Sequence, residues 1–530
     1  MDGPRSEGVR LLVRGLRCFA FASALAILAA MVALTAGIVY AQGEGGFVCN
    51  IRGFNVGPSS SVPIGRYLLA GAGVVVVAFV GVRLFAERVA PAGAEGYPRF
   101  NLLASPLRRA FLSPALRAAL KGAAIGLLLV TVIAGVIGRS PLPATMVWLY
   151  FGAGVAILSA LLGNIWMVIN PWKTIYEMLE RQLPELQGAG QEWPAEYGLW
   201  LALALLFAFR WTDLAYPERT DAGILAVLII VYSVITLGAM WYFGKRTWLR
   251  YGDPFSVLFR LLSRLSPTEV RVRDCTECAV CPCDCEGDEP CVDCYECFEL
   301  AGDDQKEINL RPFGAGLQGL RWPEPGEIAF VLFIFSSLAF AALRISRPWG
   351  DLADSLTLET TAQFVAFDSL GLFGLLAVAL VSYYLVASLL GLLTGSWEEG
   401  EDTAVGVVYA LLPVAVAFMV AHYLRFLVIE GQSIIPLASD PFGLTWDLFG
   451  TAGYRIDLDI PNAVHLWTLQ IGSLFLGGFL SVYLIDRVVS RSLAGRWAVL
   501  RGQLPATALS GGYLLLSLWL LWAGIPSKDC

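Results

Sequence analysis

Residues 421–465 read AHYLRFLVIEGQSIIPLASDPFGLTWDLFGTAGYRIDLDIPNAVH, and this stretch shows how the chain is built. It begins within an apolar run, crosses a loop rich in Gly, Pro and Asp, and enters a second apolar run. The two histidines of the protein, His422 and His465, stand at its two ends. Apolar runs joined by polar loops are the unit from which multi-pass membrane proteins are made.

The composition extends this pattern to the whole chain. Of the 530 residues, 57% are hydrophobic and only 15% are charged, whereas a soluble domain carries about 25% charged residues. The sequence therefore predicts an all-α integral membrane protein, a bundle of about 10–11 transmembrane helices with the lipid bilayer as its partner. No basic face interleaved with aromatic residues is present, so nucleic acid is excluded as a partner.

Ten apolar runs of roughly 20 residues are long enough to be membrane spans. They lie near 66–86, 117–138, 145–169, 197–213, 222–244, 326–345, 364–394, 404–429, 464–486 and 504–525. The run at 197–213 is short. The run at 364–394 exceeds one crossing, so it either tilts or breaks. A further run at 18–41 follows an Arg-rich start, and residues 1–41 are either a signal peptide or an anchor helix.

The distribution of Lys and Arg predicts the orientation, because these residues stay on the cytoplasmic side. With residue 1 in the cytoplasm, the inner segments 83–121, 245–321 and 487–501 hold most of the 37 Lys and Arg residues. We therefore expect a multi-pass protein of the cell membrane with its N-terminus and Cys-rich loop in the cytoplasm. The loop at 430–463 and the C-terminus are expected outside.

This topology divides the chain after residue 41 into three parts. Residues 42–245 form a first membrane half, 246–325 a cytoplasmic segment, and 326–530 a second membrane half. In the cytoplasmic segment, 248–265 mixes Arg with apolar residues at helical spacing. It is either an amphipathic helix on the inner leaflet or a loop helix packed on the bundle.

Eight of the eleven cysteines fall within the stretch CTECAVCPCDCEGDEPCVDCYEC at 275–297. Clustered thiols in a reducing cytoplasm more often bind a metal than form disulfides. The candidate ligands are Cys275, Cys278, Cys281, Cys283, Cys285, Cys291, Cys294 and Cys297. Eight thiolates suffice for two four-sulfur zinc sites. The ferredoxin-like spacing C-x2-C-x2-C-x3-C is also matched by Cys275, Cys278, Cys281 and Cys285. Zinc is the first expectation; iron–sulfur, copper, redox-active thiols and an unstructured acidic insertion are the alternatives.

Polar residues gather at the predicted outer face, where charges within spans by default indicate function. They are Arg210, Asp213, Asp368, His422, Arg425, Glu430, Gln432, Asp440, Asp447, Arg455, Asp457, Asp459 and His465. Together they predict an outward-facing polar cavity. A structural role is the alternative for several of them, since Arg210 and Asp213 can pair with each other. Loop aspartates such as Asp440 commonly form turns, and Asn164 and Asn170 cap or bridge helices.

The stretch HYLRFLVIEGQSIIPLASDPFGLTWDLFGTAGYR (422–455) resembles the multi-pass membrane proteins labelled fenitrothion hydrolase. GNIWMVINPWKTIYE (163–177), WLRYGDPFSVLFRLLSRLSPTE (248–269) and the final GYLLLSLWLL span are similar to the same family. The resemblance therefore runs from about residue 42 to the C-terminus. Two features depart from the family pattern: Ala41-Gln42-Gly43 replaces Ala-His-Gly, and the cysteine block has no counterpart.

The resemblance implies a membrane-embedded hydrolase of phosphoester-type substrates, a reaction in which a metal ion usually activates water. His422 would be a metal ligand or general base. Glu430 or Asp440 would be a ligand or orienting group, and Arg425 or Arg455 would stabilise developing negative charge. His465 completes this candidate catalytic set, for which a divalent metal and a small-molecule substrate are expected.

Two other functions fit the same residues. The protein could be a transporter or metal-handling membrane protein, in which the outer cavity takes a small solute or metal ion and the inner cysteine block receives or senses a metal. A redox role, with the cysteine block carrying electrons, is the third possibility.

Overall fold

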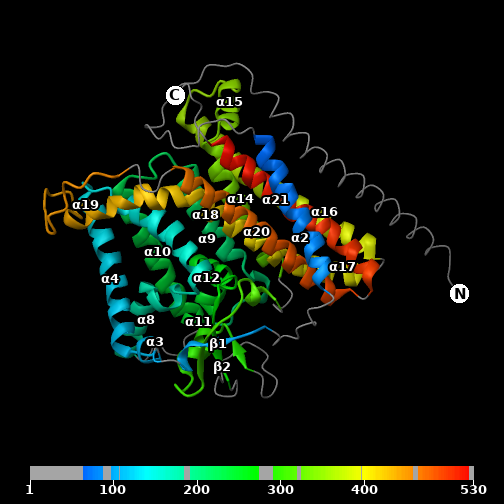
Figure 1. Ribbon diagram of the computed structural model, residues 1–530. Helices are drawn as coiled ribbons and strands as arrows, with labels where there is room; N and C mark the ends of the chain where they lie inside the picture. Colours follow the sequence, from blue (N-terminus) through cyan, green and yellow to red (C-terminus); the bar gives the residue numbers. More distant parts are fainter. Residues whose placement is uncertain are drawn as a thin grey trace. The chain divides into compact units, whose positions relative to one another are not determined.

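A computed structural model of the protein describes residues 64–86, 97–104, 106, 108–183, 191–273, 290–318, 324–394, 397–457, 463–493 and 495–524. Most of this chain is helical (Figure 1). The predicted apolar run at 18–41, and with it the choice between signal peptide and anchor helix, lies outside the described residues.

Nine helices in the described part of the chain are long and apolar enough to cross a membrane. They match nine of the ten predicted runs and fit a multi-pass membrane protein. The nine are α2 (Ile64–Ala86), α4 (Pro114–Ile137), the continuous helix of α5, η2 and α6 (Leu142–Leu162), α10 (Ala222–Phe243), α14 (Pro325–Arg344), α16 (Thr361–Thr394), the segment Thr403–Ser439, α20 (Ala463–Ser492) and α21 (Arg496–Ala523). The segment Thr403–Ser439 contains most of α17 (Trp397–Ala410), then α18 (Leu412–Ile429), the turn η8 (Glu430–Ser433) and α19 (Ile434–Ser439).

Two predicted spans have unusual lengths in the structure. The run at 197–213 forms α9 (Trp200–Leu214), a helix of 15 residues. Such a helix is about 22 Å long, less than the roughly 30 Å of a hydrocarbon core, so it is too short for a full crossing. The run at 364–394 lies within α16, one unbroken helix of 34 residues, which settles the alternative of a break.

The chain forms two compact units built from interleaved segments. Unit 1 comprises residues 1–90, 320–422 and 462–530, and unit 2 comprises 91–319 and 423–461. The division along the chain therefore passes through α18, between His422 and Tyr423.

Unit 1 is a helical bundle with α14 at its core, since 89% of the apolar window of α14 is buried. The intramembrane acid Asp368 is paired within this unit. Its carboxylate accepts hydrogen bonds from Arg344 Nε at 2.8 Å and from Trp349 Nε1 at 3.0 Å. This predicted cavity residue thus has a structural role that satisfies its charge.

Unit 2 contains a small antiparallel sheet with the strand order β1-β4-β2-β3. The strands are β1 (Phe100–Asn101), β2 (Thr268–Val272), β3 (Cys291–Val292) and β4 (Lys306–Leu310). The described residues fit the predicted all-α membrane protein for the most part, and this small sheet is a local exception to it. The central strands TEVRV and KEINL alternate apolar and polar residues and include β-branched side chains, which suits a half-buried sheet. The sheet and the helix α13 (Tyr295–Leu300) are called the sheet module below.

Two further helices of unit 2 begin beside the middle of α10. They are α8 (Pro171–Gln182) and α12 (Pro254–Ser263), each with proline at its start. The Asn170 side chain accepts the N–H of Lys173 in the first turn of α8, and the Asp253 side chain accepts the N–H of Ser256 in the first turn of α12. These caps allow a helix to begin inside a bundle, because its N-terminal N–H groups have partners. The expected capping role of Asn170 is confirmed.

The helix α12 also decides between the two interpretations of residues 248–265. Val257, Phe259 and Leu262 are completely buried, and the Asp253 carboxylate accepts a hydrogen bond from Tyr232 of α10. The segment is therefore a helix packed on the bundle.

The sheet module and the loop after α19 lie at opposite ends of one membrane helix. Thr268 of β2 donates a hydrogen bond to the carbonyl of Leu162, where α6 ends. Leu437 of α19 packs instead against Leu142, where α5 begins. The intervening helix of 21 residues is about 31 Å long, close to the thickness of a bilayer core. Figure 1 also shows α19 near one end of α4 and α3 (Arg108–Phe111) near the other.

Candidate metal centre

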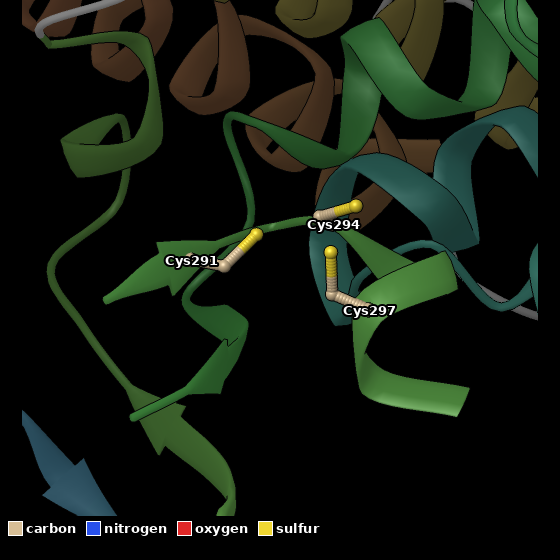
Figure 2. Close-up of side chains that lie close together, drawn as sticks. All are labelled: Cys291, Cys294 and Cys297. Carbon is tan, nitrogen blue, oxygen red and sulfur yellow. The ribbon is translucent and has the colours of Figure 1, made fainter. Parts of the chain in front are cut away.

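Three cysteines at the end of the Cys-rich block form a compact group. The Sγ atoms of Cys291, Cys294 and Cys297 all lie within 4.8 Å of one another (Figure 2). Cys291 and Cys297 are buried, and Cys294 is half-buried. Three sulfurs at these separations are close enough to bind one metal ion. Among the described residues, this is the group of His, Cys, Asp or Glu side chains that meets that condition.

The local fold brings the three sulfurs together from a strand, a turn and a helix. Strand β3 pairs with β2, which places Cys291 opposite Val272. Cys294 is the N-cap residue of α13, and Cys297 follows within that helix. Residues three apart share a helix face, so the C-x2-C-x2-C spacing suits this strand–turn–helix. In Figure 2 the side chains of Cys291 and Cys297 extend from different elements toward the Cys294 position.

Asp293 fixes the turn between the first two cysteines. Its backbone has a φ of 56°, in the left-handed region that Asp tolerates better than most residues. Its N–H donates to the carbonyl of Val270 at 2.7 Å. Its carboxylate accepts from Arg311 Nη1 at 2.7 Å and Arg264 Nη1 at 3.1 Å. The charge of Asp293 is therefore balanced by two arginines.

Arg311 links this turn to a buried carboxylate in the sheet. Glu269 has no solvent exposure, and it lies 3.3 Å from Arg311 Nη1 and 2.5 Å from Arg99 Nε. Its oxygens also accept from Tyr97 Oη at 2.7 Å and Asn309 Nδ2 at 3.0 Å. Burial alone would raise the pKa of Glu269, but these hydrogen bonds and the nearby Arg99 hold it below its ordinary value. The network therefore contains an ionised carboxylate at neutral pH.

The cysteines are a large part of the apolar core of the sheet module. Cys291 and Cys297 form a buried cluster with Val272 and Ala301, against which Phe298 packs. A core this small buries little apolar surface. Small domains of this kind commonly depend on a metal or disulfides for their stability.

The helix α13 also connects the cysteines to the membrane helices of unit 2. Tyr295 Oη accepts a hydrogen bond from the N–H of Asn164, just beyond α6. Glu299 Oε1 lies 2.5 Å from Lys173 Nζ of α8. Lys173 is 3% exposed, so this ion pair joins α13 to a buried cation. A metal held by Cys297 would thus fix a helix that contacts α8 and the residue Asn164 just beyond α6.

A small cavity opens beside α13. Its volume is about 140 Å³, and its polar lining consists of Lys173, Lys245, Arg246, Glu296 and Glu299. Burial raises the pKa of Glu296 above its ordinary value, and the nearby Cys294 raises it further. The cavity shares α13 with the cysteine group and receives charged side chains from three helical segments.

The structure describes three of the eight predicted cysteine ligands. The other five, Cys275, Cys278, Cys281, Cys283 and Cys285, lie outside the described residues. Asp293, Arg264, Arg311 and Glu269 were not predicted to support the site. The acidic run at 274–304 contains no Lys or Arg. Its positively charged partners must therefore come from outside the run, and the flanking arginines are the residues from which the sequence could have predicted them.

The five predicted catalytic residues are divided between the two units. In unit 1, His422 lies on α18 with its ring 6.1 Å from that of Phe418, and His465 is exposed at the start of α20. In unit 2, Arg425 lies in the last two turns of α18, and Glu430 begins η8. Asp440 directly follows α19. The catalytic assignment of these five residues stays a prediction.

Asp440 forms a turn, as its alternative interpretation predicted. Its two carboxylate oxygens accept the N–H groups of Leu444 at 2.9 Å and Thr445 at 2.8 Å. Asp447 similarly accepts the N–H of Ala452 at 3.0 Å. Both aspartates thereby fold the loop that follows α19.

Ser439 and Gln432 complete the fold of this loop, residues 440–457. The Ser439 hydroxyl is buried, accepts the N–H of Phe449 at 3.1 Å and lies 2.8 Å from the hydroxyl of Thr451. The Gln432 amide donates to the carbonyl of Asp457 at 2.8 Å and accepts from the same residue's N–H at 2.9 Å. Ser439 and Gln432 therefore stabilise the backbone conformation of this loop.

The predicted pair on α9 is also present. Arg210 Nη1 lies 2.6 Å from Asp213 Oδ2 and donates to Tyr423 Oη at 3.3 Å. Both residues thus satisfy each other's charge within unit 2.

Comparison with known proteins finds no matching family model, curated protein or solved structure for this chain.

Proposed function

We propose that the protein is a metal-handling membrane protein whose sheet module binds a zinc ion through Cys291, Cys294 and Cys297. The observation that carries this proposal is the approach of the three sulfurs to within 4.8 Å of one another. A fourth thiolate would come from the cysteines at 275–285, which directly precede this group in the sequence. Four sulfurs would complete the tetrahedral shell that structural zinc prefers.

The spacing of the sulfurs favours a single ion over a cluster. Tetrahedral zinc with Zn–S distances near 2.3 Å separates its sulfurs by about 3.8 Å. In an iron–sulfur cluster, no more than two thiolates share one iron atom, so three sulfurs this close to one another fit a single ion better. The half-buried Arg264 and the buried Arg311 add positive potential near the turn, which favours thiolates over thiols.

In this proposal, metal binding and folding of the sheet module are one event. The module has a very small core, and metal affinity then supplies part of its folding free energy. Because α13 contacts α8 and the residues after α6, metal binding would also order this end of unit 2. The nearby cations Lys173, Lys245 and Arg246 support a cytoplasmic position for this end.

This function corresponds to the metal-handling alternative expected from the sequence. It is preferred to the phosphoester hydrolase because the cysteine group offers a set of converging ligands within one unit. The hydrolase implied by the family resemblance makes no use of that group.

The experiment is metal analysis of protein purified without oxygen, combined with its absorption spectrum. The expected sample is colourless and contains zinc, and Cys297→Ser loses one equivalent relative to wild type. Cys530→Ser is the matched control and retains the full amount, since Cys530 lies outside the Cys-rich block. A brown sample containing iron would overturn the choice of zinc. A metal-free sample that binds no added zinc would overturn the proposal.

A further inference from the structure

The loop 440–457 presents large apolar side chains outward, although its backbone is tightly folded. Trp446, Leu448 and Phe449 are 43%, 58% and 71% exposed. The hydrogen bonds of Ser439, Asp440 and Asp447 hold the neighbouring backbone. An exposed apolar group on an ordered loop requires a partner surface, because its contact with water is unfavourable.

This loop sits directly on the end of the membrane helix α4. A Cβ atom on Gly443, whose φ is +67°, would lie 2.6 Å from the carbonyl oxygen of Arg139, just after α4. Phe442 packs on the cluster of Ala134, Leu142 and Leu437. The Trp446 ring meets that of Phe442 edge-on, with centroids 5.5 Å apart. The exposed loop residues are therefore continuous with the end of an apolar helix.

The surface of α4 is itself apolar and exposed at this end. Val136 is 70% exposed and Ile133 is 47% exposed, on a helix long and apolar enough to cross a membrane. Other aromatic residues mark the same end of unit 2. Trp148 Nε1 donates to the carbonyl of Arg219 at 2.9 Å, in the connection that precedes α10. Trp residues at the ends of apolar helices are typical of the membrane interface, where the ring is partly apolar and the N–H is satisfied.

We propose that loop 440–457 is an interfacial anchor that inserts Trp446, Leu448 and Phe449 into the bilayer beside the end of α4. The partner is the lipid interface, because the patch continues the lipid-facing surface of that helix. The one acid between these side chains, Asp447, turns a carboxylate oxygen onto the N–H of Ala452, so it need not repel lipid. The loop therefore fixes the depth of unit 2 in the membrane, independently of the metal site at the opposite end.

The test places one environment-sensitive fluorescent amino acid at position 449 of the full-length protein in phosphatidylcholine nanodiscs. The same probe replaces Leu127, exposed midway along α4, as the lipid control, and Asp304, exposed before β4, as the water control. Quenchers are a lipid with a nitroxide on its upper acyl chain and aqueous iodide. Each variant is checked for an unchanged elution volume, so that only folded protein is compared.

At position 449 we expect strong quenching by the nitroxide lipid and several-fold weaker quenching by iodide than at position 304. Strong iodide quenching without lipid quenching would overturn the anchor, because the loop would then face water. Shielding from both quenchers would also overturn it, because a protein surface would then cover the loop.

Discussion

The Asp293 carboxylate lies 2.7 Å from Nη1 of Arg311, and both side chains are buried. This ion pair holds the turn between Cys291 and Cys294 against the sheet. Arg311 is shared with Glu269, so the geometry of the cysteine group depends on charges that bind no metal themselves.

Asp293→Ala is expected to weaken zinc binding strongly. The variant leaves Arg311 without its nearest carboxylate, and loss of one partner of a buried pair costs roughly 3–5 kcal/mol. Alanine also tolerates the left-handed backbone poorly. Asp293→Asn keeps an oxygen acceptor and a residue type that accepts this backbone, so its loss should be smaller. Competition with a chromophoric chelator measures the zinc affinity of both variants. Equal affinities for wild type and the alanine variant would contradict the role of the ion pair.

The sheet module is expected to lose stability in acid through Glu269. Its pKa is lower in the folded protein than in the unfolded chain, so its contribution is complete above about pH 4.3, the unfolded value. That contribution disappears as the pH falls through the folded pKa. The measurement is amide hydrogen exchange in β2 and β4, compared between wild type and Glu269→Gln at each pH. The comparison is needed because acid protonates the cysteine thiolates in both proteins, and this shared effect cancels in the difference. The difference should be large at pH 7 and shrink below pH 4; a constant difference would refute this role of the charge.

Gly163→Ala is expected to destabilise the contact between α6 and the sheet. A Cβ atom there would lie 2.2 Å from Thr268 Oγ1, and the φ of +117° is unfavourable for alanine. The expected cost is about 1–3 kcal/mol from overpacking, with backbone strain in addition. Gly122→Ala is the matched control, because a Cβ on that residue of α4 would meet no atom within 4 Å. Thermal unfolding in detergent should separate the two variants, and equal transition temperatures would contradict the expected clash.

Gly135→Ala should disturb the packing of α4 against α10. Its Cβ would lie 2.6 Å from both the carbonyl oxygen of Ala222 and the Cβ of Ala226. Close helix approach in membranes depends on such small residues, so the transition temperature should fall. Gly126→Ala on the same helix has open space around the added atom and should leave it unchanged or higher. A fall for both variants would assign the effect to glycine in general and not to this contact.

Ser439→Ala is expected to loosen the loop after α19 without unfolding the bundle. The buried hydroxyl accepts the N–H of Phe449 and lies beside the hydroxyl of Thr451. In the variant both groups lose this partner, and a buried polar group left without a partner costs about 1–3 kcal/mol. Limited proteolysis should therefore cut within 440–457 faster in the variant, with the other fragments unchanged. Thr445→Ala provides the control because its side chain is exposed and bonds only to the adjacent carbonyl of Leu444. Equal cleavage of both variants would contradict the proposed role of Ser439.

The membrane helices could be predicted from the sequence because each needs only a local run of apolar residues. The run at 197–213 was predicted to be a span, but its helix has only 15 residues and is too short for a full crossing. The sheet was missed because its strands are short and one comes from far away in the chain. Phe100 of β1 pairs with Leu310 of β4, and no local pattern reports such a pairing.

The candidate metal centre could be predicted only at the level of its ligands. The spacing of Cys291, Cys294 and Cys297 indicates a metal site without any structure. The residues that orient these cysteines are distant in sequence, as with Glu269, 42 residues before Arg311. Likewise, Asp440 had both a catalytic and a turn-forming interpretation, and its two backbone hydrogen bonds became visible only when the loop was folded.

The helix Leu142–Leu162 has the sheet module at one end and the motif loop at the other. If this helix crosses a sealed membrane, its two ends face different solutions. A membrane-impermeant chelator would therefore remove the metal from one side only. The cysteine group would take up its ion from that compartment alone, so its occupancy would follow the free metal concentration there and remain insensitive to the solution that bathes the loop.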